Sequence, residues 1–140
     1  FINVVTSMDY ERLLCATGPY EGEILRSSDK KHPKKIAWVQ CVGSRRVTPG
    51  DNSYCSSVCC TYTQKQVILS KDHNADLDAT IFHNDIRAFG KGYEQFYQTA
   101  RAMGIEFVKA KVARIDEQED GERALHGRFL RRWRISVANR

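Results

Sequence analysis

Short, largely apolar runs recur along the chain, and each is typical of a strand. Residues 36–42 and 79–82 are nearly continuous apolar runs, and residues 105–112 combine apolar and β-branched positions with charged ones. Runs of this length between turn-forming residues predict strands that are buried in a sheet. Residues 1–5 are also apolar and β-branched, so we expect another short strand at the start of the chain.

Two helical patterns lie between these runs. Residues 6–9, Thr-Ser-Met-Asp, predict a capping box followed by a short helix that runs through Leu14. Asn52 or Ser53 is expected to cap a longer helix over about 54–70, because its apolar residues recur close to helical spacing.

A third amphipathic helix is expected over 93–103, with Gly104 where the helix should stop. Its apolar face has positions i, i+3, i+4, i+7 and i+10, which are Tyr93, Phe96, Tyr97, Ala100 and Met103. Alternation of strands and helices predicts the α/β class and a doubly wound parallel sheet with right-handed crossovers. We therefore expect a three-layer Rossmann-like unit.

The charge divides the chain into two expected parts. Formal net charge is +5, but residues 123–140 contain six arginines and no acidic residue. Without these six, the 22 basic residues fall to 16 against 17 acidic ones, a net charge of −1. We expect an α/β domain over 1–122 and a basic tail over 123–140. Nucleic-acid binding through the tail ranks last among the functions considered, because the charge is not on the folded body.

The cysteine content indicates reduced thiols in a cytoplasmic setting. The chain has five cysteines, an odd number, and its first residues do not have the pattern of a signal peptide, so a secreted disulfide scaffold is not expected. No apolar run approaches the roughly 18 residues that a membrane span needs. These features favour metal binding or redox chemistry.

Four of the cysteines are predicted to lie together. Cys41 is expected at the carboxyl end of the strand over 36–42, and Cys55, Cys59 and Cys60 at the start of the next helix. These two places are neighbours in a parallel sheet, where ligands bind. Cys55 and Cys59, at i and i+4, would share one helix face. Thiolates or an anionic cluster would gain there from the helix dipole and from free backbone N–H groups.

The spacing leaves three kinds of site open. Iron–sulfur clusters take four cysteine thiolates, and structural zinc can take the same set. The pattern C-x13-C-x3-C-C lacks the two spaced pairs that zinc sites usually show. Redox-active or merely buried cysteines are the third alternative. Cys15 is expected to be a buried structural thiol, and His83 an ordinary half-buried residue.

Three motifs in order resemble the A subunit of heterodisulfide reductase. They are Lys35–Arg45 (KIAWVQCVGSR), Tyr54–Cys60 (YCSSVCC) and Asp85–Glu94 (DIRAFGKGYE). The resemblance extends over roughly residues 3 to 115. It implies an internal fragment of an iron–sulfur flavoprotein with a thioredoxin-reductase-like core, in the part that a nicotinamide domain would occupy.

The resemblance also implies cofactors and partners. Cys41, Cys55, Cys59 and Cys60 would ligate one [4Fe–4S] cluster that relays electrons between flavin and other clusters. FAD would belong to the full-length protein, and other heterodisulfide reductase-like subunits and ferredoxin-type carriers would be the partners. In methanogens such subunits reduce a heterodisulfide and couple electron bifurcation to ferredoxin.

The chain departs from that family in two respects. It lacks the Gly-rich flavin fingerprint and the ferredoxin-like cysteine runs of the full-length family, so we expect it neither to hold FAD nor to be active alone. The turn over 41–45 has one glycine, so a nicotinamide cradle is not expected either. The tail over 123–140 is expected to be a truncated or out-of-frame end. A structural or interaction module, with zinc or no metal, is the alternative function.

Overall fold

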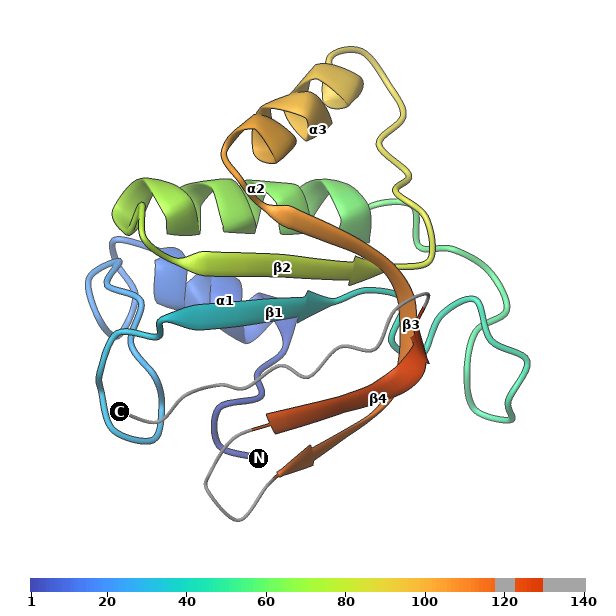
Figure 1. Ribbon diagram of the computed structural model, residues 1–140, viewed down its shortest axis with the longest axis horizontal. Coiled ribbons are helices and arrows are strands. Elements are labelled where there is room, and N and C mark those ends of the chain that lie inside the picture. The colour runs from blue at the N-terminus through green and yellow to red at the C-terminus, as the bar shows by residue number, and fades with distance from the viewer. Residues whose placement is uncertain (118–122, 130–140) are drawn as a thin grey trace.

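The computed structural model describes residues 1–117 and 123–129 (Figure 1). In chain order, the helices and strands are α1 (Ser7–Leu14), β1 (Lys35–Val39), α2 (Cys59–His73), β2 (Asp78–His83), α3 (Tyr93–Ala102), β3 (Glu106–Glu117) and β4 (Arg123–Phe129). Helices and strands alternate from α1 to β3, and a fourth strand follows β3. The alternation that the apolar runs predict from residue 36 onward is confirmed.

The sheet has the order β1-β2-β3-β4, with β1, β2 and β3 parallel to one another. The predicted α/β, Rossmann-like arrangement is therefore confirmed. The strand order does not reverse within the described residues. Two right-handed crossovers that advance in the same direction put their helices on the same face of a sheet. The crossover helices α2 and α3 are therefore expected on the same face of the sheet, and residues of α1 and α2 share one hydrophobic cluster with the sheet (Figure 1).

The strand register explains which side chains enter the core. Ile36 pairs with Ala79, and Trp38 with Ile81, which in turn lies beside Phe107. These residues face the helices and belong to, or pack against, the main hydrophobic cluster. Because side chains alternate across a strand, the register also fixes the cluster's position between the sheet and the helix layer.

The first helix begins where the capping box predicts. Thr6 Oγ1 accepts a hydrogen bond from the backbone N–H of Asp9 at 3.2 Å, and Asp9 Oδ2 accepts one from the backbone N–H of Thr6 at 3.2 Å. This reciprocal pair satisfies two N–H groups at the helix start. The helix buries Tyr10 and Leu14, and the ring of Tyr10 meets Trp38 edge to face with centroids 5.5 Å apart.

Two local predictions are wrong. Residues 1–5 form a turn and irregular backbone instead of a strand, because they pair with no strand of the sheet. The second helix begins at Cys59 rather than near Tyr54, and Val58 is its N-cap, without a side-chain hydrogen bond. The polar groups at residues 52–54 are used elsewhere, since they bond back to residues 43–46.

Strand β4 lies inside the segment that we expected to be a separate tail. Arg123 pairs with Glu117, and Phe129 with Ala110, in an antiparallel ladder on the far part of β3. Residues 123–129 of the segment expected to be the basic tail therefore pair with β3. Residues 130–140 lie outside the described part of the chain. Across the described residues, the helices are all too short or too polar to span a membrane.

Candidate cluster-binding site

Cys41 lies where the chain leaves the sheet. Strand β1 ends at Val39, and Cys41 follows Gln40 with a φ of 59°, in the left-handed region. This conformation is uncommon for residues other than glycine and costs roughly 1–2 kcal/mol. Gln40 is anchored below it, because its buried Nε2 donates to Thr63 Oγ1 of α2 at 2.6 Å. The sheet thus holds Cys41 at its carboxyl edge.

A closed loop brings Cys55 back to the same edge. The backbone N–H of Asn52 donates to the carbonyl of Gly43 at 2.9 Å, and the N–H of Arg45 donates to the carbonyl of Tyr54 at 3.2 Å. Ser44 Oγ donates to the same Tyr54 carbonyl at 2.8 Å. These bonds return the chain to its starting point, so Cys55 follows a residue that is bonded to the turn after Cys41.

Cys55 is not in the helix. It precedes Cys59 by four residues, but α2 begins only at Cys59, so the expectation that the two share a helix face is wrong. The intervening chain turns at Ser57, whose φ is 68° and whose N–H donates to Cys55 Sγ at 3.4 Å. Cys55 therefore approaches the helix start from the loop.

Cys59 and Cys60 occupy the first turn of α2 and share a hydrogen bond. A hydrogen bond from the Cys60 thiol to the Cys59 sulfur lowers the pKa of Cys59 to about 5. Burial opposes this lowering, and a hydrogen bond with Ser56 adds to it. The pKa of Cys60 is raised by its bond to Cys59, by burial and by the neighbouring charges of Cys59 and Cys41. One thiolate in the pair is thus favoured at neutral pH.

The loop after β2 completes this edge. Cys60 Sγ lies 3.8 Å from the backbone carbonyl of Asp85. The Asp85 carboxylate pairs with the Arg45 guanidinium, and Arg87 Nε lies 3.7 Å from Asp85 Oδ1. The pKa of Arg45 is raised, mainly by Asp85 and also by Cys41. Asp85 therefore contacts Cys60 through its backbone carbonyl and Arg45 through its carboxylate, and Arg45 in turn influences Cys41.

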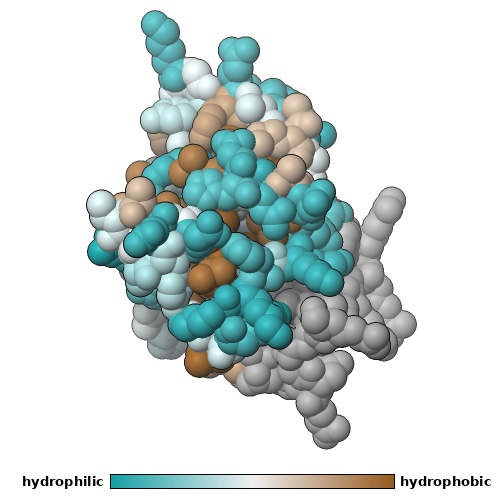
Figure 2. Space-filling model, turned by 90° about the vertical axis from the view of Figure 1, so that its left-hand side faces the viewer, coloured by the Kyte–Doolittle hydropathy of each residue, from teal (hydrophilic) through white to brown (hydrophobic). Residues whose placement is uncertain are grey.

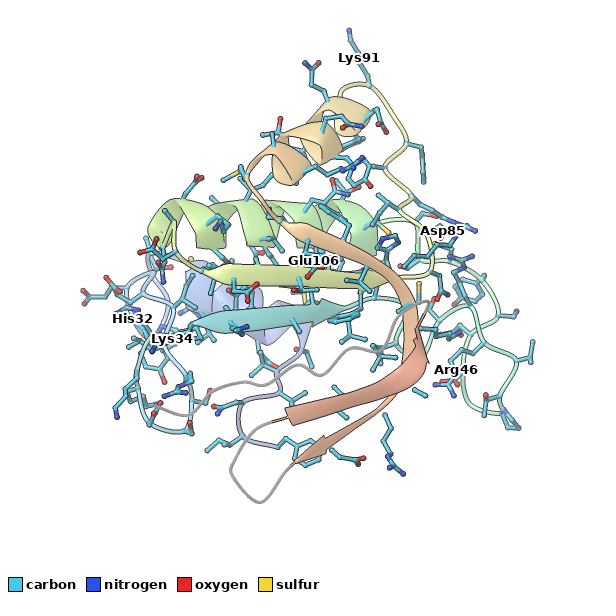
Figure 3. All side chains as sticks on the ribbon, viewed as in Figure 1. His32, Lys34, Arg46, Asp85, Lys91 and Glu106 are labelled. Atoms are coloured by element: carbon cyan, nitrogen blue, oxygen red, sulfur yellow. The ribbon has the colours of Figure 1, made fainter. Side chains whose placement is uncertain are left out.

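These contacts lie at the carboxyl ends of β1 and β2. Figure 3 shows Asp85 and Arg46 at that end and His32 and Lys34 at the opposite one. Arg46 pairs with Asp51 inside the loop, with Nε and Oδ2 3.0 Å apart. Arg45 is therefore the arginine that faces the thiols, whereas Arg46 closes the loop.

The four cysteines lie at the carboxyl edge of the sheet, in the loop that follows β1 and in the first turn of α2. No group of three or more His, Cys, Asp or Glu side chains among the described residues is arranged to hold a single metal ion. A tetrahedral zinc ion with bonds of about 2.3 Å would need its four sulfurs about 3.8 Å from one another. A cluster of four irons is larger and takes sulfurs set more widely apart. The donor set, four unpaired thiols from one edge of the sheet, fits a cluster chemically.

The altered acidity of Cys59 leads to a labelling prediction. At pH 6 a thiol with a pKa of about 5 is mostly thiolate, roughly 300-fold more so than a thiol with the ordinary pKa of about 8.5. Lower basicity reduces the reactivity of each thiolate by about 40-fold. In the metal-free chain, iodoacetamide should therefore label Cys59 about tenfold faster than a model peptide thiol at this pH.

Peptide mass spectrometry over a pH series measures this rate. The labelling of Cys59 should rise with a midpoint near pH 5 and then level off, while Cys60 stays protected until the chain is unfolded. A Cys59 rate that climbs through pH 8 to 9 like that of a free thiol would contradict the shared hydrogen bond.

Cys15, His32 and His73 lie away from this edge. Cys15 is exposed, not buried as expected, because it caps the end of α1, where its sulfur lies 3.2 Å from Thr17 Oγ1. His32 and His73 line a small pocket of about 30 Å³ at the opposite end of the sheet. That end is mostly hydrophilic with scattered apolar patches (Figure 2).

Two further residues lie at the carboxyl edge of the sheet beside the four cysteines, which we call the cysteine edge, and the sequence did not single them out as site residues. The pairing of Asp85 with Arg45 is recognisable only from the fold, since the two residues are 40 positions apart in the sequence. Gln64 is fully buried one turn into α2 although its side chain is polar. His83, the last residue of β2, is also buried, which lowers its pKa. The sequence signal for Asp85 itself is its place at the start of the third motif, Asp85–Glu94, shortly after the strand predicted over 79–82.

Comparison with known proteins identifies the chain's relatives. No family model matches it. It is 43% identical over 119 residues to the A subunit of the H(2):CoB-CoM heterodisulfide,ferredoxin reductase of Methanothermobacter marburgensis, a match that covers 84% of this chain and 18% of that protein. It is 44% identical to the A subunit of the ferredoxin/F(420)H(2)-dependent CoB-CoM heterodisulfide reductase of Methanosarcina acetivorans, covering 85% and 15%.

A third relative is named as an iron–sulfur protein. The iron–sulfur A subunit of the CoB–CoM heterodisulfide reductase of Methanocaldococcus jannaschii is 40% identical over 119 residues, covering 84% of this chain. The chain spans less than a fifth of the length of these relatives. Over 119 residues, the chain is therefore homologous to a segment of the heterodisulfide reductase A subunits.

Proposed function

We propose that this chain is an electron-carrying segment of a heterodisulfide reductase A-like iron–sulfur flavoprotein. Cys41, Cys55, Cys59 and Cys60 would hold a [4Fe–4S] cluster, which supplies reversible one-electron chemistry when bound. The observation that carries the proposal is the hydrogen-bonded return of the loop, which brings Cys55 to the edge that already holds Cys41 and the first turn of α2.

The surrounding residues suit an anionic ligand. The start of α2 has no side-chain cap, so the positive end of its dipole is open to negative charge. The guanidinium of Arg45 interacts electrostatically with Cys41 and is held in place by its ion pair with Asp85. The shared hydrogen bond of Cys59 and Cys60 favours a thiolate, which is the form that binds iron. The chain itself contributes ligands, charge balance and position, while the redox chemistry belongs to the cofactor.

The wider assignment rests on the relatives. FAD would bind to other parts of a full-length protein, since no Gly-rich flavin motif occurs in this sequence. Ferredoxin, which appears in the names of several relatives, and other heterodisulfide reductase subunits would be the electron partners. The five unpaired thiols support a reducing compartment such as the cytoplasm.

Electron uptake tests the proposal. After anaerobic reconstitution with iron and sulfide, stepwise reduction should consume about one electron per chain and generate a paramagnetic signal that disappears on reoxidation. The same chain loaded with zinc is the control, since zinc has no redox chemistry. A reconstituted chain that takes up no more electrons than the zinc form would instead favour a structural or interaction module.

A further inference from the structure

Three buried side chains hold polar atoms without a hydrogen-bond partner in the described residues. These atoms are both amide atoms of Gln64, Oε1 of Gln66 and Nδ1 of His83. Gln66 is otherwise satisfied, because its Nε2 donates to the Ser7 carbonyl at 2.9 Å and to Glu11 Oε2 at 3.1 Å. Gln66 therefore ties α2 to α1, whereas Gln64 has no such bond.

Gln64 and His83 both lie beneath the cysteine edge. Gln64 is four residues after Cys60, so it lies on the same face of α2, about 6 Å further along the helix. His83 is two residues before Asp85, whose carbonyl contacts Cys60, and two strand residues span about 6.6 Å. Because α2 runs back from the carboxyl end of the sheet, both residues lie at about the same depth below Cys60.

A purely structural role does not account for these side chains. A buried donor or acceptor without a partner destabilises the fold, whereas an apolar side chain of similar shape would not. The neighbouring Gln40 shows the alternative, since its amide is satisfied by Thr63 at 2.6 Å. Unpaired polar atoms at this depth are available to hydrogen-bond to a ligand group above them.

We propose that His83 and Gln64 donate hydrogen bonds to the sulfurs of the cluster held by the four cysteines and thereby raise its reduction potential. This inference rests on the proposed function. A reduced cluster carries one more negative charge than an oxidised one, so N–H donors stabilise the reduced form more. The two residues would thus set the potential without serving as ligands.

Redox titration of reconstituted variants tests this role. Gln64→Leu and His83→Leu should each reduce the ratio of reduced to oxidised cluster about three- to tenfold at a fixed applied potential. For a one-electron couple, this change corresponds to a reduction potential that is lower by about 28 to 59 mV. His83→Gln, which keeps a donor, should restore most of the shift. Gln66→Leu is the matched control, a buried glutamine of the same helix that faces α1, and should leave the potential unchanged.

Stability of the metal-free chain gives an independent readout. Gln64→Leu should raise the urea midpoint of the apo chain, because it removes two unpaired polar atoms. A wild-type chain that binds a cluster whose potential moves equally, or not at all, in the Gln64, His83 and Gln66 variants would overturn this inference alone. A wild-type chain that binds no cluster would overturn the proposed function, and the inference with it.

Discussion

Replacing any one of Cys41, Cys55, Cys59 or Cys60 by serine is expected to reduce bound iron from about four to less than about one per reconstituted chain. Cluster assembly needs four thiolates, and a serine hydroxyl at the same place remains protonated at neutral pH. The loss should appear in iron analysis and in the absorption near 400 nm, while the far-ultraviolet circular dichroism stays that of the folded chain.

Cys15→Ser supplies the matched control for this series. Cys15 is exposed at the end of α1 and takes no part in the contacts at the cysteine edge. Its serine variant should therefore keep the iron content of the wild type. Retention of full iron in any of the four edge variants would remove that cysteine from the ligand set.

The second large effect concerns stability. Ile81→Ala should lower the free energy of unfolding by about 2–5 kcal/mol, because truncating a buried isoleucine loses its apolar contacts and leaves a cavity. Ile81 is 1% exposed in the centre of the sheet, between Trp38 of β1 and Phe107 of β3 in register, and belongs to the core cluster. Urea unfolding of the metal-free chain measures the change.

Val47→Ala provides the comparison for the core variant. Val47 is 95% exposed in the loop after β1, so its truncation should change the stability by less than about 0.5 kcal/mol. Equal effects of the two substitutions would contradict the placement of β2 at the centre of the core.

Local rules succeed for elements whose own residues specify them. The capping box at Thr6 forms as predicted, since both partners lie within four residues. The helix over 93–102 and the strand over 78–83 follow from periodicity and from a short apolar run. The expectation that Cys41 lies at a sheet edge follows from the same strand pattern and agrees with the structure.

Non-local pairing explains what the sequence could not predict. Helix α2 begins later than predicted because the backbone at residues 52–54 bonds to residues 43–46. The helix propensity of the residues around Tyr54 gives no information about these non-local bonds. The exposure of Cys15 depends on where α1 ends, and apolar neighbours alone suggest burial. The face of the sheet that α2 and α3 cover depends on the direction of both crossovers, which the order of the elements alone leaves open.

The site too has some features that the sequence predicts and others that depend on non-local contacts. Residue types and the family resemblance single out the four cysteines, but their approach depends on the loop and on the Arg45–Asp85 pair. Gln64 appears on the sequence as one polar residue of an amphipathic helix. Only burial reveals that its amide has no partner in the described residues and lies under the cysteine edge.

Iron and acid-labile sulfide analysis of the anaerobically reconstituted wild-type chain tests the central claim most directly, with the Cys59→Ser, Cys60→Ser double variant treated in parallel. The account predicts about four iron and four sulfide per wild-type chain and neither in the variant. Equal iron in both samples, or none in the wild type, would contradict a cluster on these cysteines.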